Sequence, residues 1–374
     1  MLLSTGFLTR QLASGCRRGF WSSANLFSTN KNASNSSGIS SSWKVVEKVT
    51  ERKVPPLSNV TINSTDCPVL VCPADLQQYP DSDRLLVYLL KNEEEDGTVL
   101  QLVQATPNTF NIDVHGGTDD KALEVHVPVQ SNINAFCNGF GDVSVSEIHS
   151  DRLAVVTTTG DIRTKNIRCS EIVLATQGGS VLSKGVLQGK INIKTLAKGS
   201  VECQKLQGPS ATVESDNGQI NIASDYCDKS SVATHSGNIK FGSLHRKCKV
   251  EIRGKGNLVA AGLDGRLQAV INQGNADVQI SNLVGHSNIE VAQGDVRVQL
   301  GETDKNFVHL SADQVDVPGD FGAKTFSENG KVVAQFGREE KDQGDLKVSV
   351  SSGKISVERS SWIASLNLKK NLTA

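Results

Sequence analysis

The stretch that decides the fold is GDVSVSEIHSDRLAVVTTTGDIRTKNI, residues 141–167, because it holds one complete repeat and the start of the next. The Gly-Asp pair at 141–142 returns at 160–161, and both copies are followed by alternating apolar and polar residues. Such alternation is typical of a strand with one buried face. A strand that returns after nineteen residues predicts a chain wound into stacked coils.

The same spacing extends beyond this stretch and defines a series of turn positions. Successive glycines lie 18 to 20 residues apart as far as residue 294, and a charged insertion at 337–344 precedes the last one. We expect each glycine to take a positive φ, and the short polar residue after it to bond its own turn. The predicted turn glycines are Gly141, Gly160, Gly179, Gly199, Gly218, Gly237, Gly256, Gly274, Gly294 and Gly353.

The residues two and four positions after each glycine form two apolar columns. In the first column, Val201, Ile220 and Ile239 belong to three consecutive coils. One coil cannot bury its apolar side alone, but stacked coils bury it between them. The sequence therefore predicts an all-β, single-stranded β-solenoid, β-helix-like or β-roll-like, of about twelve coils. The pattern continues in weaker form after Asp313 and Gly330.

Composition and periodicity divide the chain into four parts. Residues 1–42 form a leader, and residues 43–130 hold strand-like runs without the nineteen-residue period, which predicts an irregular β cap at the N-terminal end. The repeats occupy residues 131–360, and residues 361–374 form a C-terminal cap or tail. Caps are expected because the end coils of a solenoid would otherwise leave unpaired strand edges.

The leader has the composition of a mitochondrial transit peptide. The first 46 residues contain arginine and many serines but no Asp or Glu, and their apolar residues are interrupted. The spacing of Arg18, Phe20, Ser23 and Phe27 matches two-step processing, with a mature chain starting near Ser28. Five N-x-Ser/Thr sequons favour the alternative of a secreted protein, in which alone they would matter. We expect a mitochondrial location, in the matrix or at the inner membrane.

Charge and cysteine usage exclude several classes of protein. Without the five basic residues of the leader, 34 Lys and Arg face 40 Asp and Glu, so the remaining chain is mildly acidic and no nucleic-acid partner is expected. No apolar run approaches the length of a transmembrane helix. The eight cysteines include no CxxC pair and do not cluster with histidines in the sequence. We therefore expect no metal site and no cofactor.

Residues 123–167 carry a family resemblance. The run LEVHVPVQSNINAFCNGFGDVSVSEIHSDRLAVVTTTGDIRTKNI resembles the putative-adhesin domain family of unknown function, with a strand ending in Val-Pro and then Gly-Asp-Ile/Val units. The resemblance covers roughly residues 120–300, and extends to 360 in its weaker form. It implies a repeat architecture, and it provides no catalytic residues.

Two chemical interpretations of the repeat compete with a structural one. Asp142 and Asp161 share a column, so their carboxylates could stand about 5 Å apart, as in a retaining glycosidase. The simpler interpretation is that both hold turns, as Asn238 and Asn257 do farther along. Calcium is disfavoured because Ser, Gln and Asn replace the acid in later rows.

The remaining candidate site is a basic face. It consists of Lys184, Lys190, Lys194, Lys198 and Lys205, with a second basic group at 245–249. These residues could bind an acidic protein or an anionic surface, or they could form an ordinary solvated face. We expect a non-catalytic binding or scaffolding protein. The alternatives are a secreted or cell-surface adhesin-like protein and, second, a β-helix enzyme that acts on polysaccharides.

Overall fold

The computed structural model describes residues 44–91, 99–115, 121–301, 306–337 and 344–360. The chain divides into two compact units, residues 1–182 and residues 183–374. Within the described residues, the only regular element other than β-strands is a short 3₁₀ turn, η1 (Gly319–Phe321). No helix of this described part is long and apolar enough to span a membrane. The predicted all-β class is confirmed, and so is the β-solenoid architecture.

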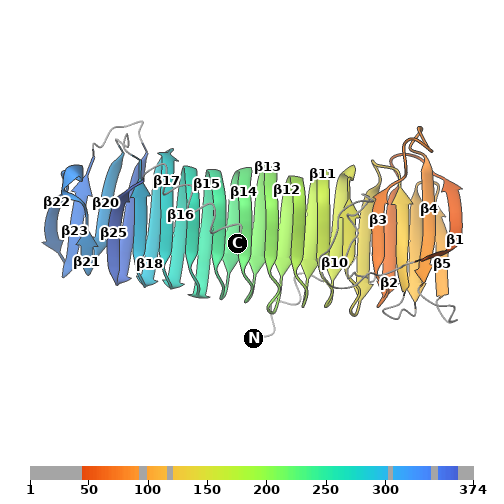
Figure 1. The fold of residues 1–374 in the computed structure, drawn as a ribbon, viewed down its shortest axis with the longest axis horizontal. Coiled ribbons are helices and arrows are strands. Elements are labelled where there is room, and N and C mark those ends of the chain that lie inside the picture. Colours follow the sequence, from red (N-terminus) through yellow and green to blue (C-terminus); the bar gives the residue numbers. More distant parts are fainter. Residues whose placement is uncertain (1–43, 92–98, 116–120, 302–305, 338–343, 361–374) are drawn as a thin grey trace, which may run out of the picture. The chain divides into compact units, whose positions relative to one another are not determined.

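Unit 1, drawn from red to yellow-green in Figure 1, consists of parallel strands with antiparallel additions. Its strands are β1 (Lys44–Lys53), β2 (Asn59–Thr65), β3 (Val69–Pro73), β4 (Arg84–Lys91), β5 (Val99–Thr106), β6 (Thr109–His115), β7 (Lys121–Val127), β8 (Asn132–Asn138), β9 (Val143–Ser146), β10 (His149–Thr157) and β11 (Ile162–Thr176). The long strand β11 pairs in parallel with β9 at one end and with β10 at the other. One coil therefore turns from one wall to the next within a single strand.

The N-terminal end of unit 1 does not stack in chain order. Strand β2 pairs in parallel with β6 on one side and with β8 on the other. Strand β3 likewise lies between β7 and β9. The coil 59–73 is thus inserted between the coils 109–127 and 132–146. The region predicted as an irregular cap therefore contains coils of the same parallel stack, which the sequence did not predict.

Antiparallel strands complete this end of unit 1. Strand β5 pairs antiparallel with β6, β4 pairs antiparallel with β7, and β1 pairs antiparallel with β4. They cover strands that would otherwise present a parallel edge, as expected for a cap.

Unit 2 continues the repeat in longer strands, drawn from green to blue in Figure 1. Strand β12 (Val181–Thr195) begins just before the unit boundary. It is followed by β13 (Val201–Ser215), β14 (Ile220–Thr234), β15 (Ile239–Lys255), β16 (Leu258–Gln273), β17 (Ala276–Leu283), β18 (His286–Gln293), β19 (Val296–Leu300), β20 (Phe307–Ala312), β21 (Gln314–Asp316), β22 (Lys324–Glu328), β23 (Lys331–Phe336), β24 (Asp345–Ser352) and β25 (Lys354–Arg359).

The predicted inward columns are confirmed by register and burial. Val201 pairs with Ile220, and Ile220 with Ile239, in parallel strands. All three side chains are at most 1% exposed. Asp225 lies seven residues after Gly218, where the neighbouring coils have Leu206 and Leu244, and it is fully buried between these two leucines.

The C-terminal end of unit 2 also leaves chain order. Strand β24 pairs in parallel with both β18 and β20, and β25 with both β19 and β21. The coil 345–359 is thus inserted between the coils 286–300 and 307–316. Val315, predicted to follow Asp313 into the core, pairs with Ile355 and is half-buried.

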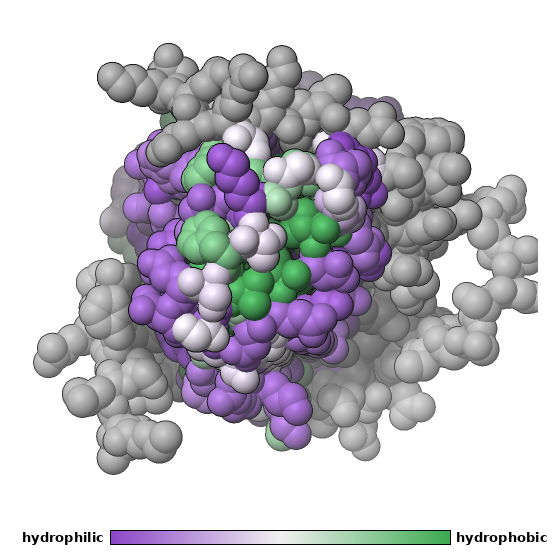
Figure 2. Space-filling model, turned by 90° about the vertical axis from the view of Figure 1, so that its left-hand side faces the viewer, coloured by the Kyte–Doolittle hydropathy of each residue, from purple (hydrophilic) through white to green (hydrophobic). Residues whose placement is uncertain are grey.

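The repeat predicted after Gly330 is not a coil. Asn329 and Gly330 both have positive φ, at 51° and 76°, and form the tight turn of a hairpin between β22 and β23. This hairpin adds to β20 in antiparallel orientation. Figure 2 shows that end of the molecule, where apolar surface lies in the middle of a largely hydrophilic face. The predicted cap at 361–374 lies outside the described residues.

The sequence suggested positive φ as the reason for the turn glycines, which holds for Gly237, Gly274, Gly294 and Gly353, and the structure adds a second reason. Gly237 does have a positive φ of 149°, but Gly160 does not. A Cβ on Gly160 would lie 2.0 Å from the carbonyl oxygen of Gly141, the equivalent glycine one coil earlier. Real Cβ atoms essentially never approach backbone so closely. Close stacking of successive turns therefore requires glycine even where φ does not.

Candidate functional site

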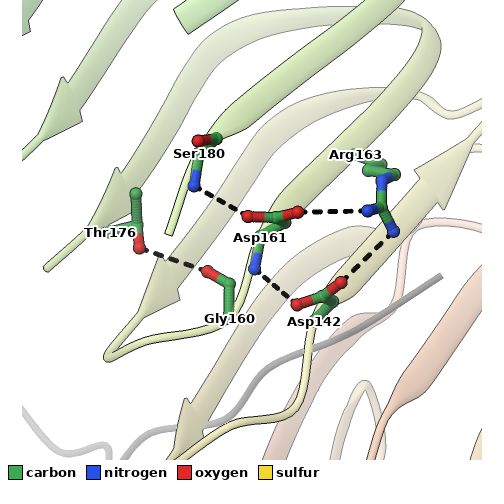
Figure 3. A network of polar contacts seen from close by, with 6 residues as sticks. All are labelled: Asp142, Gly160, Asp161, Arg163, Thr176 and Ser180. Atoms are coloured by element: carbon green, nitrogen blue, oxygen red, sulfur yellow. Dashed lines mark hydrogen bonds and ion pairs between the residues drawn. The ribbon is translucent and has the colours of Figure 1, made fainter. Parts of the chain in front are cut away.

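The polar residues after the turn glycines join one coil to the next (Figure 3). Oδ1 of Asp142 accepts a hydrogen bond from the backbone N–H of Asp161 at 2.6 Å. Oδ1 of Asp161 accepts one from the N–H of Ser180 at 2.9 Å. The sequence predicted bonds within each turn, and the structure instead shows bonds that run along the stack.

Arg163 binds both of these carboxylates (Figure 3). Its guanidinium lies 3.2 Å from Oδ2 of Asp142 and 3.0 Å from Oδ2 of Asp161. Burial raises the pKa of Asp142 to about 7, helped by the charge of Asp161, although the Asp161 N–H and Arg163 oppose the shift. Both oxygens of Asp142 are thus engaged, and its side chain is 9% exposed.

The same ladder recurs in unit 2 with neutral side chains. Oδ1 of Asn238 accepts from the N–H of Asn257 at 2.9 Å, and Oδ1 of Asn257 from the N–H of Asn275 at 2.8 Å. Asn275 and Asp295 extend the series, the latter to the N–H of Lys354 in the inserted coil. Asp and Asn can both make this bond between coils, because it uses a single side-chain oxygen.

The structure divides the predicted basic face rather than gathering it. Nζ of Lys194 forms an ion pair with Glu214 at 2.9 Å, and Nζ of Lys205 lies 5.0 Å from the centre of the Tyr226 ring. Lys184, Lys190 and Lys198 are exposed. At least these two members of the five are therefore committed to contacts within the protein, and Lys184 also has a partner there.

A better-defined basic feature lies on the outer side of three successive coils. Lys229 pairs in register with Lys247, and Lys247 pairs with Arg266. The next residues along these strands, Ser230 and Cys248, are buried, so the three cations face outward. We call Lys229, Lys247 and Arg266 the cationic column. The sequence did not predict it, because a register shift near residue 225 changes the spacing from 19 to 18 residues.

None of the three cations forms an ion pair with a described residue. The nearest basic neighbour, Arg246, differs in this respect, because its Nε lies 3.2 Å from Asp228. Nε of Arg266 is buried and has no hydrogen-bond acceptor. Like charges directly opposite one another on neighbouring strands repel. The column is therefore a row of positive charge that no described acidic side chain pairs with.

A second group of chemically active side chains lies in unit 1, where the sequence predicted none. Cys72 on β3 pairs in register with His126 on β7, and Glu124 lies two residues before His126 on the same face. One sulfur, one nitrogen and one carboxylate oxygen of these three residues all lie within 4.8 Å of one another. Parallel pairing brings together residues more than fifty positions apart, and no local spacing in the sequence shows this.

His126 is held between two acidic groups. Burial lowers the pKa of His126, but hydrogen bonds and charge from Cys72 and Glu124 outweigh this and raise it to about 10. Nε2 of His126 lies 2.8 Å from Oε1 of Glu124. The edge of the Tyr88 ring contacts the imidazole, with 5.2 Å between ring centres. The imidazole is thus fixed in place and surrounded by potential negative charge.

The comparison with protein families agrees with this architecture. The family model described as Toastrack DUF4097 matches residues 87–358. A "putative cell adhesion protein" from Clostridium sporogenes ATCC 15579 is 8% identical over 83% of this chain and 98% of its own, with a TM-score of 0.14. A "putative adhesin" from Bacteroides fragilis NCTC 9343 is 9% identical over 83% and 95%, with a TM-score of 0.26. At these TM-scores no detail of structure or function can be transferred from either protein.

Proposed function

Because this chain belongs to the Toastrack DUF4097 family, we propose that it is a non-catalytic binding or scaffolding protein built on a β-solenoid, and that the cationic column binds an acidic segment of a partner protein. The observation that carries the proposal is the in-register stacking of Lys229, Lys247 and Arg266 without acidic partners among the residues that the structure describes. Stacked strands lie about 4.8 Å apart, so the column is a narrow line of charge. A line suits an extended acidic segment better than a broad membrane surface.

An aromatic neighbour supports a protein partner. Tyr226 lies on β14 near Lys229, is 42% exposed, and stacks on His245 with 4.3 Å between ring centres. Tyrosine and arginine are enriched in protein interfaces, whereas lipid headgroups need only charge. A fixed, exposed aromatic ring on the strand that carries Lys229 therefore supports a protein partner over a lipid surface.

The geometry of the acidic pair supports a structural role over catalysis. Asp142 and Asp161 both contact Arg163, and each also accepts a backbone N–H from the following coil. A glycosidase needs its two carboxyls free to reach the sugar from opposite sides. These carboxyls are committed to the protein itself, which is why we propose that the chain is not an enzyme.

Binding can be tested with a fluorescent glutamate-rich peptide and with vesicles that contain anionic lipid. The charge-reversed variant with Lys229→Glu, Lys247→Glu and Arg266→Glu should bind the peptide at least about tenfold more weakly, and binding by the wild type should weaken as salt is raised. The matched control, with Lys255→Glu, Lys324→Glu and Lys347→Glu, makes the same change of net charge on exposed lysines outside both candidate basic surfaces. Equal losses in both variants, or binding to vesicles alone, would contradict the proposal.

We further propose a mitochondrial location, based on the acid-free first 46 residues. A fusion of these residues to a fluorescent protein should enter mitochondria, and the native N-terminus should lie between residues 21 and 46. Secretion and glycosylation at the sequons would instead support the adhesin-like alternative.

A further inference from the structure

We propose that Cys72, Glu124 and His126 form a binding site for one zinc ion, with a fourth coordination position left open. The three residues come from two neighbouring strands, β3 and β7, and their ligand atoms converge within 4.8 Å of one another. The prediction that this chain has no metal site rested on spacing in the sequence. That spacing does not show that these three residues lie together in the fold.

The donor set indicates the class of metal. A thiolate and an imidazole are ligands for zinc and other borderline or soft ions, whereas calcium and magnesium prefer oxygen alone. Zinc binds sulfur at about 2.3 Å and nitrogen or oxygen at about 2.0–2.2 Å, which places neighbouring donors of a tetrahedron roughly 3.4 Å apart. Nε2 of His126 and Oε1 of Glu124 now lie 2.8 Å apart, so they need to separate by well under 1 Å.

The site is open to solvent, and the orientation of its imidazole is already restricted. The side chains of His126 and Glu124 are 24% and 23% exposed, and Cys72 is also partly exposed, so an ion can enter from solvent. The Tyr88 ring packs edge-on against the imidazole and limits its rotation. By contrast, Cys67 and Cys137 are buried beside backbone carbonyls. Cys72 therefore differs from these neighbouring thiols in having both an imidazole and a carboxylate within reach.

Coordination would link two coils that are not adjacent in sequence. Cys72 belongs to the inserted coil 59–73, and the other two ligands belong to the coil 109–127 next to it. Metal binding requires a deprotonated thiol and imidazole, and it replaces the His126–Glu124 hydrogen bond with bonds to the metal. Zinc should thus stabilise the N-terminal end of unit 1 and shield the Cys72 thiol.

The test uses full-length, metal-free protein titrated with Zn²⁺ and, separately, with Co²⁺. We expect one equivalent of zinc per chain, a rise in melting temperature, and a cobalt spectrum with thiolate charge-transfer bands. Cys72→Ser should abolish the charge-transfer bands, and His126→Gln should weaken zinc binding at least about tenfold, as expected for loss of a ligand. Glu124→Gln should also weaken it.

Matched controls separate loss of a ligand from loss of fold. Cys169→Ser and His149→Gln remove a thiol and an imidazole elsewhere in unit 1 and should leave zinc binding unchanged. Wild type and Cys72→Ser should melt alike without metal, and zinc should slow alkylation of Cys72 only in proteins that retain the other two ligands. No stoichiometric binding, equal binding of Mg²⁺, or unchanged binding by Cys72→Ser would overturn the proposal. These outcomes do not depend on the cationic column, which lies in unit 2.

Discussion

Asp225 is a carboxyl group at a position that an apolar residue fills in the neighbouring coils. It is fully buried between Leu206 and Leu244, its Oδ1 accepts the N–H of Cys227 at 3.0 Å, and its Oδ2 has no hydrogen-bond partner. Burial raises the pKa of Asp225, so the folded state holds its proton more strongly than the unfolded state does. Stability from this group is complete below the unfolded pKa near 4 and is lost as pH rises through the folded pKa.

Asp225→Asn should therefore stabilise the protein at neutral pH. The amide keeps the acceptor for Cys227 and removes the charge, and we expect a gain on the order of 1–2 kcal/mol at pH 7.5 that shrinks toward pH 4. Urea melts at both pH values measure it. Asp216→Asn makes the same change at an exposed site and should stay within about 0.5 kcal/mol. A destabilised Asp225→Asn protein at neutral pH would instead show that the charge itself is required.

The double substitution Asp142→Asn and Asp161→Asn tests the turn ladder. Asparagine keeps the Oδ1 acceptors that bind the N–H groups of Asp161 and Ser180, as Asn238 does for Asn257. We expect an intact fold and unchanged peptide binding, with the loss limited to the contacts of Arg163. Replacing both residues by alanine removes the acceptors and should cost about 1 kcal/mol for each hydrogen bond. Loss of a cellular function in a stable Asn variant would point to chemistry at this pair.

At the scale of the strand, the alternation of inward and outward side chains decides which substitutions destabilise the fold. Ile220 points into the core, and its neighbour Asn221 lies outside between Glu202 and Lys240. Ile220→Asp places an unpaired charge in a dry interior and should cost several kcal/mol, whereas Asn221→Asp should cost within about 0.5 kcal/mol. Urea melts of the two variants test this contrast.

Limited proteolysis adds a test of locality. Each coil contacts only its neighbours, so nicking of the Ile220→Asp protein should begin near residues 218–237. Equal destabilisation by both substitutions, or uniform loss of protection, would mean that the register is wrong.

The sequence predicted the strands that pair with the strand one repeat earlier or later in the chain. Alternation around Val201 and Ile239 was sufficient to assign the inward face, because one strand and one turn determine it. The inserted coils could not be predicted, because their neighbours lie 59 or 73 residues away in register, as His286 does from Asp345 and Asn59 from Asn132. The site at Cys72 and His126 escaped prediction for the same reason.

On the scale of the whole chain, each unit has one end where the coils do not stack in chain order. In unit 1 the coil 109–127 lies outside the coil 59–73, which comes first in the chain. In unit 2 the coil 307–316 lies outside the coil 345–359, which comes last. Strand β2 is bonded on both sides, whereas β5 pairs only with β6 among the described strands. Native-state hydrogen exchange should therefore be as slow in β2 as in β8, and faster in β5. In unit 2, β24 is likewise bonded on both sides and should exchange more slowly than β22. Exchange in β2 ahead of β5 would contradict the observed strand order.

The inserted coils also constrain how the chain can be completed on the ribosome. The coil 59–73 is synthesised early, yet the strands on both sides of it appear only after residue 108. The coil 345–359 is synthesised late, and until then the coils 286–300 and 307–316 lack the partner that separates them. A prematurely terminated product ending before residue 345 would therefore expose open edges on both of these coils. Open strand edges invite aggregation and binding by chaperones. Chaperones should therefore bind an incomplete chain, which exposes these edges, in preference to a complete one.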